Sequence, residues 1–200
     1  MAECKKISGG TYQDEVEHII SYQPRNKFIR NLALSLRGNT LILYAYVEKH
    51  GEVLHDMIRD KAGERKVFFV HGGVGGDERE SIRHIVEKEK DAIIVASYGT
   101  FSTGINIKNL HNVIFASPTK SRIRTLQSIG RGLRISDTKD SMTLFDIADD
   151  LTHNKKKNYT LNHLIERVKM YSSEGFPYEL HNIKLRSDNG TGRSLFSEDE

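Results

Sequence analysis

Five short apolar runs, separated by segments of helical spacing, dominate the pattern of this 200-residue chain. The runs are continuous rather than alternating, which is typical of strands buried on both faces of a parallel sheet. Between them, apolar residues recur with the helical period and predict amphipathic helices. The alternation of strands and helices predicts an α/β fold with a parallel sheet and right-handed crossovers. The predicted strands are 40–46, 66–70, 92–96, 112–116 and 141–147, and the predicted helices include 47–61, 77–89 and 158–172.

The same pattern divides the chain into four parts. Residues 24–150 contain the alternating elements and form the predicted lobe, in which a first helix opens at Pro24. Residues 1–23 are polar, and we interpret them as a lead-in or interlobe linker. Residues 151–185 are expected to form a C-terminal helical extension that packs back on the lobe. Residues 186–200 are rich in Ser, Gly, Asn and Asp and are expected to be disordered.

The segment from Gln127 to Arg134 carries the strongest functional signal. On a helix that Ser121 can cap, Gln127, Arg131 and Arg134 lie at i, i+4 and i+7 and share one stripe. This stripe is narrow, carries two fixed cations and contains no acid, which suits the stabilisation of phosphate charge. A solvated basic helix is the alternative interpretation. The apolar residues of the helix lie on roughly the opposite side: Leu126, Ile129 and Leu133.

A second signal follows the predicted strand 92–96. Residues 97–106 are mostly small or polar, and the carboxyl end of a strand is where open parallel sheets bind ligands. Gly99 and Gly104 permit close approach of a ligand to the backbone, and the Ser and Thr hydroxyls can donate to phosphate oxygens. Taken alone, such a loop is also ordinary connecting structure.

These two segments, in this order and at this distance, resemble motifs V and VI of superfamily 2 helicases. Ser102–Asn106 resembles motif V, and Gln127–Arg134, with its pattern Q-x-x-G-R-x-x-R, resembles motif VI. The resemblance implies a RecA-like parallel sheet with flanking helices and an extra C-terminal helix, the second lobe of a helicase. It is strongest to the phage UvsW-type ATP-dependent DNA helicases. Further segments resemble motif IV, the strand after it and the strand after motif VI: 40–45, 67–72 and 141–147.

The resemblance also implies roles for individual residues. Arg131 would be the arginine finger at the γ-phosphate of ATP, and Arg134 the second phosphate contact. Gln127, Gly104 and Asn106 would lie on the nucleotide side, although most relatives carry Asp where this chain has Asn106. The residues implied to face the nucleic-acid backbone are His71, Gly72, Ser102, Thr103, Arg122 and Arg124.

The sequence lacks the part of an ATPase site that binds the nucleotide phosphates. No G-x-x-x-x-G-K-[ST] motif occurs, and the glycine-rich stretch 72–76 lacks the lysine and hydroxyl of a phosphate cradle. The acidic stretch Asp14–Glu17 has no buried strand before it, and we interpret it as solvated linker. We therefore expect ATP and Mg²⁺ to be held mainly by an absent N-terminal lobe that acts in cis. No metal site is expected in this chain.

Composition changes this picture only slightly. The single Cys4 excludes a disulfide framework and a cysteine-based zinc site, and the nine histidines show no metal-ligand spacing, so each is expected at the surface or a helix end. Apolar runs are too short to span a membrane, and the first residues lack a signal-peptide core, which together predict a cytoplasmic protein. Basic clusters around Arg122–Arg124 and at Lys155–Lys157 suit a phosphate backbone, although charge runs are usually solvated.

The predicted function is therefore the second motor lobe of an ATP-dependent DNA helicase or translocase. Its expected partner is branched or single-stranded DNA, with RNA as a further option, and its expected setting is recombination, repair or replication-fork processing. A non-enzymatic α/β module that binds nucleic acid or phosphate is the alternative. A small-molecule phosphotransferase would need its own phosphate loop or a general base at a strand end, and the sequence supplies neither.

Overall fold

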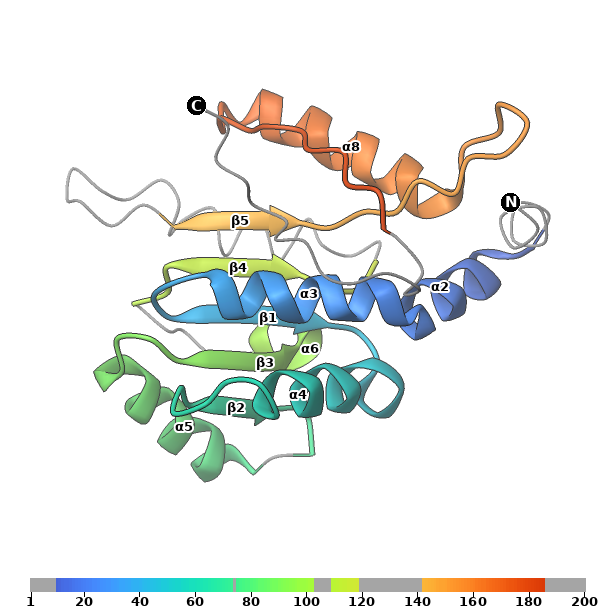
Figure 1. The fold of residues 1–200 in the computed structure, drawn as a ribbon. Helices are drawn as coiled ribbons and strands as arrows, with labels where there is room; N and C mark the ends of the chain where they lie inside the picture. The colour runs from blue at the N-terminus through green and yellow to red at the C-terminus, as the bar shows by residue number, and fades with distance from the viewer. Residues whose placement is uncertain (1–9, 74, 103–108, 119–141, 186–200) are drawn as a thin grey trace, which may run out of the picture.

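The computed structural model describes residues 10–73, 75–102, 109–118 and 142–185. They form a five-stranded sheet in the order β2-β3-β1-β4-β5, and every pairing in it is parallel (Figure 1). The predicted α/β fold with a parallel sheet is confirmed. Each predicted strand is present within one or two residues of its predicted ends. The strands are β1 (Thr40–Tyr44), β2 (Val67–Val70), β3 (Ile93–Ser97), β4 (Asn112–Phe115) and β5 (Thr143–Asp146).

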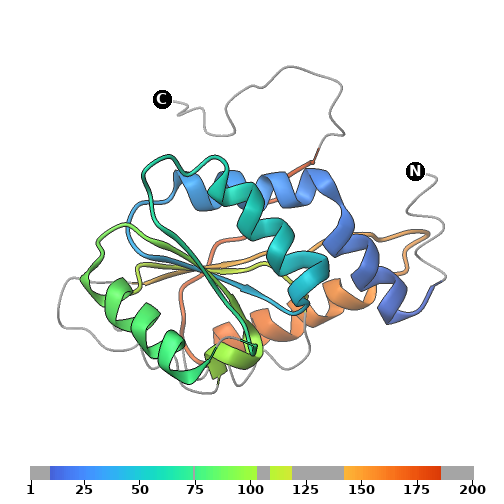
Figure 2. The same cartoon turned by 90° about the horizontal axis from the view of Figure 1, so that it is seen from below.

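Helices cover both faces of the sheet. One face is covered by α3 (Gln23–Ser35) and α4 (Glu52–Arg59), and the other by α5 (Gly76–Lys88), α6 (Tyr98–Ser102) and α8 (Tyr159–Ser173) (Figure 2). This three-layer arrangement explains the continuous apolar runs, because the central strands β1 and β4 are buried along their whole length. Within the described ranges, no helix is both long and apolar enough to cross a bilayer.

Two hydrophobic clusters, one on each face, hold the layers together. Ile29, Leu32 and Ala33 of α3 pack with Ile42 and Tyr44 on one face, as the helical spacing predicts. On the other face Leu41, Leu43, Val86 of α5 and Tyr171 of α8 pack together, so the predicted docking of the last helix is confirmed. Ile85 of α5 takes no part in this packing, because it is 43% exposed.

The polar lead-in is the main correction to the predicted fold. Residues Tyr12–Ser21 form the helix α2, which begins with a capping box between Thr11 and Asp14. Val16, Ile19 and Ile20 lie at i, i+3 and i+4 and are buried. The flanking charges obscured this short apolar stripe. The interpretation of Asp14–Glu17 as solvated linker is therefore wrong.

Buried Glu15 explains why α2 belongs to the folded unit. Its carboxylate accepts hydrogen bonds from the backbone N–H groups of Tyr159 (2.8 Å) and Thr160 (2.7 Å), at the start of α8. The same carboxylate accepts a bond from the Asn158 side chain at 2.8 Å. Burial alone would raise the pKa of Glu15, but a bond from the Thr160 side chain and the bonds above together lower it. A carboxylate at a helix N-terminus is favoured by the helix dipole, so α2 and α8 stabilise one another.

Candidate functional site at the carboxyl edge of the sheet

The carboxyl ends of all five strands meet at one edge of the sheet, because every pairing is parallel. Open parallel sheets bind ligands at this edge. The first predicted contact, the turn His71–Gly72, directly follows β2 at this edge. The imidazole Nδ1 of His71 accepts a bond from the Gly73 N–H at 3.1 Å, and the ring lies 5.1 Å from that of Phe69. Gly72 is exposed, and apart from its chain neighbours no atom of the described residues lies within 4 Å of the place where a Cβ would be.

The helix α6 follows the neighbouring strand β3 at the same edge. Ser97, the residue before α6, caps the helix, because its hydroxyl oxygen accepts from the Thr100 N–H at 3.2 Å and lies 2.7 Å from the Thr100 hydroxyl. Ser102 is the last residue of α6, so the structure brings its backbone and the His71–Gly72 turn to adjacent strand ends. The other predicted site residues lie outside the described residues: Thr103, Gly104, Asn106, Arg122, Arg124, Gln127, Arg131 and Arg134.

A buried chain of neutral polar groups occupies the middle of this edge. The Ser117 hydroxyl lies 2.7 Å from Nδ1 of His50, and Nε2 of His50 lies 3.2 Å from Oδ1 of Asn26. Asn26 donates through its amide nitrogen to the Ile20 carbonyl, so its Oδ1 accepts and Nε2 of His50 carries the hydrogen. Nδ1 then accepts from the Ser117 hydroxyl, whose oxygen in turn accepts from the Ala45 N–H at 3.1 Å. Each of these groups is satisfied while His50 stays neutral.

His50 reaches this position through an irregular turn. Residues Val47–Gly51 form the π-helical turn η1, in which the Gly51 N–H donates to the Tyr46 carbonyl at 2.9 Å. A Cβ on Gly51 would lie 2.5 Å from the Tyr44 ring, so only glycine allows this close packing. The continuous helix predicted over 47–61 is therefore divided into η1 and α4. His50 lies in the last turn of η1, at a helix end, but it is fully buried there and not at the surface.

Arg25 of α3 completes the cluster with a charge. Its Nε donates to both oxygens of Asp149 at 2.9 Å, and its Nη1 donates to the Ala116 carbonyl at 2.7 Å. The Arg25 side chain is only 1% exposed and Asp149 is 15% exposed, so this is a buried ion pair. The Tyr98 hydroxyl of α6 donates to the next carbonyl, that of Ser117, at 3.0 Å.

The contacts converge on Ala116 and Ser117, the residues between β4 and Pro118. They come from α3, η1, α6 and the end of β1, and together they fix the direction in which the chain leaves β4. The segment 119–141, which contains the predicted phosphate-binding arginines, begins directly after Pro118. The described structure therefore provides a fixed base for that segment.

Sequence reasoning missed this cluster, although a signal for part of it exists. Asn26, Ile29 and Ala33 share one stripe of α3, and Arg25, Ile29 and Leu32 share another, so polar residues interrupt a buried face. A polar side chain at such a position needs a buried partner. Local spacing does not reveal which partner, because Arg25 and Asp149 are 124 positions apart.

The buried imidazole predicts an acid-dependent loss of stability. Burial lowers the pKa of His50 to about 3, and the Arg25 guanidinium adds to the effect. The unfolded chain takes up this proton near the ordinary histidine pKa of about 6.5. The contribution of His50 to stability is therefore fully present above that pH and is lost as the pH falls toward 3, at about 1.4 kcal/mol per pH unit.

His50→Gln should remove this dependence, because glutamine does not titrate and can still donate and accept. Between about pH 7 and about pH 5, the free energy of unfolding measured in urea should fall by about 2 kcal/mol more in the unmodified protein than in this variant. His84→Gln, an exposed histidine of α5, is the matched control and should follow the unmodified chain. Parallel pH dependences for all three proteins would show that His50 is not buried in its neutral form.

Comparisons with known proteins agree with this architecture. The family described as "Helicase conserved C-terminal domain" matches residues 23–136. The chain is 38% identical over 193 residues to the ATP-dependent DNA helicase uvsW of Enterobacteria phage T4, and the match covers 90% of this chain and 38% of that protein.

The solved structures give the same result. The crystal structure of T4 UvsW matches with a TM-score of 0.76 over 92% of this chain and 40% of that one. The C-terminal domain of the DEAD-box protein Dbp5 shares the fold at 15% identity, with a TM-score of 0.56 and coverage of 77% of this chain and 82% of that one. The chain thus spans well under half of the T4 protein and matches its fold over nearly its own full length.

Proposed function

This chain belongs to the helicase conserved C-terminal domain family, and on that premise we propose that it is the second motor lobe of an ATP-dependent DNA helicase or translocase. The single observation that carries the proposal is the 38% identity to the phage T4 DNA helicase over 90% of this chain. The proposed substrate is branched or single-stranded DNA, in recombination, repair or replication-fork processing. The closeness of the sequence to the T4 helicase, more than any described contact, supports this choice of substrate.

In the proposed mechanism, positive charge from this lobe stabilises the transferring phosphoryl group. Arg131 would approach the γ-phosphate of ATP as the arginine finger, with Arg134 as a second contact, and such a finger contributes about 10³–10⁵ in rate. Gln127 would orient the helix that carries them, and Gly104 and Asn106 would face the nucleotide. The buried cluster around Ser117 supports this role, because preorganised charge is effective only on a rigid base.

ATP and Mg²⁺ would be held mainly by a separate N-terminal lobe in cis. The residues of this chain fit that division, because the sequence lacks a phosphate loop. Among the described residues, no group of three or more His, Cys, Asp or Glu side chains could hold a metal ion. When bound, Mg²⁺ neutralises charge on the phosphates, and the side chains of this lobe would add the charge that completes the site.

The proposed nucleic-acid contacts lie along the same edge of the sheet. The exposed Gly72 backbone and the end of α6 at Ser102 follow adjacent strands, which supports a shared contact with one phosphate backbone. Thr103, Arg122 and Arg124 would extend it. Closure of the two lobes around ATP would move this contact along the strand. Each cycle of hydrolysis would then advance the protein one step along the nucleic acid. The contacts proposed are to phosphate, so binding should be indifferent to base sequence.

ATP turnover in the two forms of the protein tests this proposal. The 200-residue chain alone is expected to hydrolyse ATP no faster than background, with or without DNA, because its sequence has no phosphate loop. The chain joined to its phosphate-loop lobe should show turnover that DNA stimulates. Phosphate release at saturating ATP measures both. DNA-stimulated turnover by the chain alone would contradict the assignment of ATP binding to the other lobe. A joined protein that binds DNA without any turnover would favour the non-enzymatic module.

A further inference from the structure

The connection between β5 and α8 contains a tight basic turn that lies outside the family match. The His153 N–H donates to the Lys156 carbonyl at 3.2 Å, and the Lys156 N–H donates back at 2.9 Å. Asn154 and Lys155 both have positive φ, 49° and 64°, which is the pattern of a type I′ turn. The second of these positions favours glycine, yet it holds a lysine. A residue with a Cβ in this conformation is costly, so the charge at the tip calls for a functional explanation.

The turn is exposed at its tip and fixed at its base. Residues 154–157 are exposed, while Asn158 is buried. The Asn158 side chain accepts from the Leu151 N–H at 2.9 Å and donates to the Asp149 carbonyl at 3.1 Å, which closes the neck of the loop. The loop projects from the body beside the start of α8 in both ribbon views (Figures 1 and 2).

The charge of the turn is not cancelled by its neighbours. Within the part of the chain that the structure describes, Lys155, Lys156 and Lys157 take part in no ion pair. Of the described acids near the loop, Asp149 is paired with Arg25. Glu15 is buried and accepts bonds from the first N–H groups of α8. Hydrogen bonds from the Thr152 side chain and from the Thr152 N–H lower the pKa of Asp150, with a smaller effect of Lys157.

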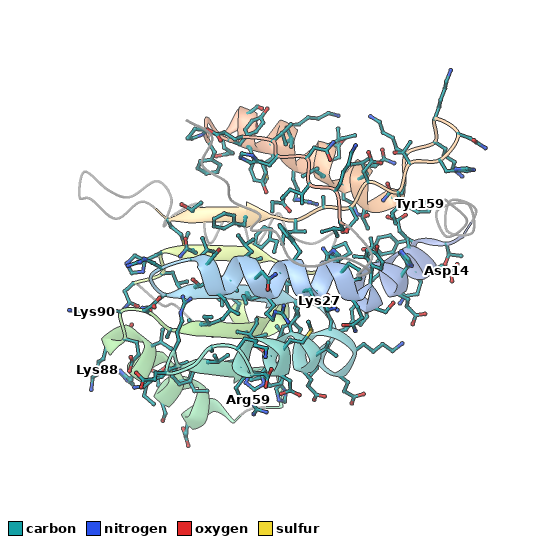
Figure 3. The ribbon with its side chains drawn as sticks, in the orientation of Figure 1. Asp14, Lys27, Arg59, Lys88, Lys90 and Tyr159 are labelled. Atoms are coloured by element: carbon teal, nitrogen blue, oxygen red, sulfur yellow. The ribbon has the colours of Figure 1, made fainter. Side chains whose placement is uncertain are left out.

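An exposed aromatic side chain lies next to these lysines. Tyr159 is 47% exposed at the first position of α8, beside the start of α2 (Figure 3). Its ring meets that of Tyr12 edge to face at 6.3 Å, which holds it in place. Cations that follow a backbone, combined with an aromatic ring for a base, are the elements of sites for single-stranded nucleic acid.

We propose that Lys155, Lys156, Lys157 and Tyr159 form a contact surface for single-stranded nucleic acid, separate from the predicted helicase motifs. The inference rests on the proposed function, because a motor lobe must hold a strand during its cycle. The lysines bind phosphates and Tyr159 stacks on a base. The surface lies beyond residue 136, the end of the family match, so it adds a nucleic-acid contact that the family motifs do not include.

Fluorescence anisotropy of a labelled oligothymidine across a salt series tests this surface in the full 200-residue chain. The turn variant is Lys155→Gly, Lys156→Ser and Lys157→Ser, in which glycine keeps the left-handed backbone. Affinity at low salt should fall about 10-fold or more, and the slope of log affinity against log salt should decrease by about 2, since each contact on a single strand contributes about 0.7. Tyr159→Ala should weaken binding about 5-fold without changing the slope.

The matched control removes the same charge elsewhere: Lys61→Ser, Lys88→Ser and Lys90→Ser. These lysines are exposed, and Figure 3 shows Lys88 and Lys90 at the end of the molecule opposite Tyr159. The control should bind nearly as the unmodified chain does. Equal losses in the turn variant and the control, or no loss in the turn variant, would overturn the proposal. The result of this titration does not decide the proposed motor function. That function would be overturned if the unmodified joined protein showed no DNA-stimulated ATP turnover.

Discussion

Arg25→Met is expected to lower the free energy of unfolding by about 3–5 kcal/mol. Methionine keeps much of the volume of the side chain, but it leaves the Asp149 carboxylate without its cation in a site that is only 15% exposed. It also removes the donor to the Ala116 carbonyl. A buried acceptor without a partner is costly, so both losses act in the same direction. Urea unfolding monitored by circular dichroism measures the change.

Two further variants separate the ion pair from a general effect of the substitution. Arg59→Met removes an arginine that is 66% exposed on α4, and it should change stability by less than about 0.5 kcal/mol. Arg25→Met combined with Asp149→Leu removes both charges and should recover much of the loss, because the cost arises from one unpaired charge. If Arg25→Met unfolds at the same urea concentration as Arg59→Met, the pair does not hold the end of β4.

The sequence alone predicts most of the sheet, because buried parallel strands leave a local signature. The run Ile93–Ala96 has no polar interruption, and the structure buries it in the centre of the sheet. The helices α3 and α8 were predictable for the same reason, since their apolar stripes follow the helical period. The helix α2 was missed because three buried apolar residues in a charged segment are too few for a clear period.

The candidate site was predictable to a smaller extent. The carboxyl edge follows from the parallel strands, and the structure places the His71–Gly72 turn there, while its contact with nucleic acid stays a prediction. The polar cluster depends on pairs that are far apart in the chain, such as His50 with Ser117, 67 positions away. Local periodicity contains no information on such pairs, because only the tertiary fold brings them together. The roles of Gln127, Arg131 and Arg134 stay predictions, since these residues lie outside the described ranges.

The largest expected functional effect belongs to Arg131. In the protein that joins this chain to its phosphate-loop lobe, Arg131→Ala should lower ATP turnover by about 10²-fold or more, while the KM for ATP changes far less. The reason is that the guanidinium acts on charge that develops in the transition state. Arg131→Lys should rescue turnover poorly, because an ammonium group does not reproduce the planar fork of donors. Thermal stability should be unchanged, since the polar stripe of this helix is predicted to face away from the core.

The central claim is tested most directly by steady-state, DNA-stimulated ATP turnover, measured beside thermal melts. The variants are Arg131→Ala, Arg131→Lys and the exposed control Arg59→Ala. The account predicts a large fall in kcat for both Arg131 variants, an unchanged kcat for Arg59→Ala and four closely similar melting curves when the unmodified protein is included. An Arg131→Ala protein that keeps full turnover, or one that loses turnover only because the domain melts, would contradict the assignment of Arg131 as the arginine finger.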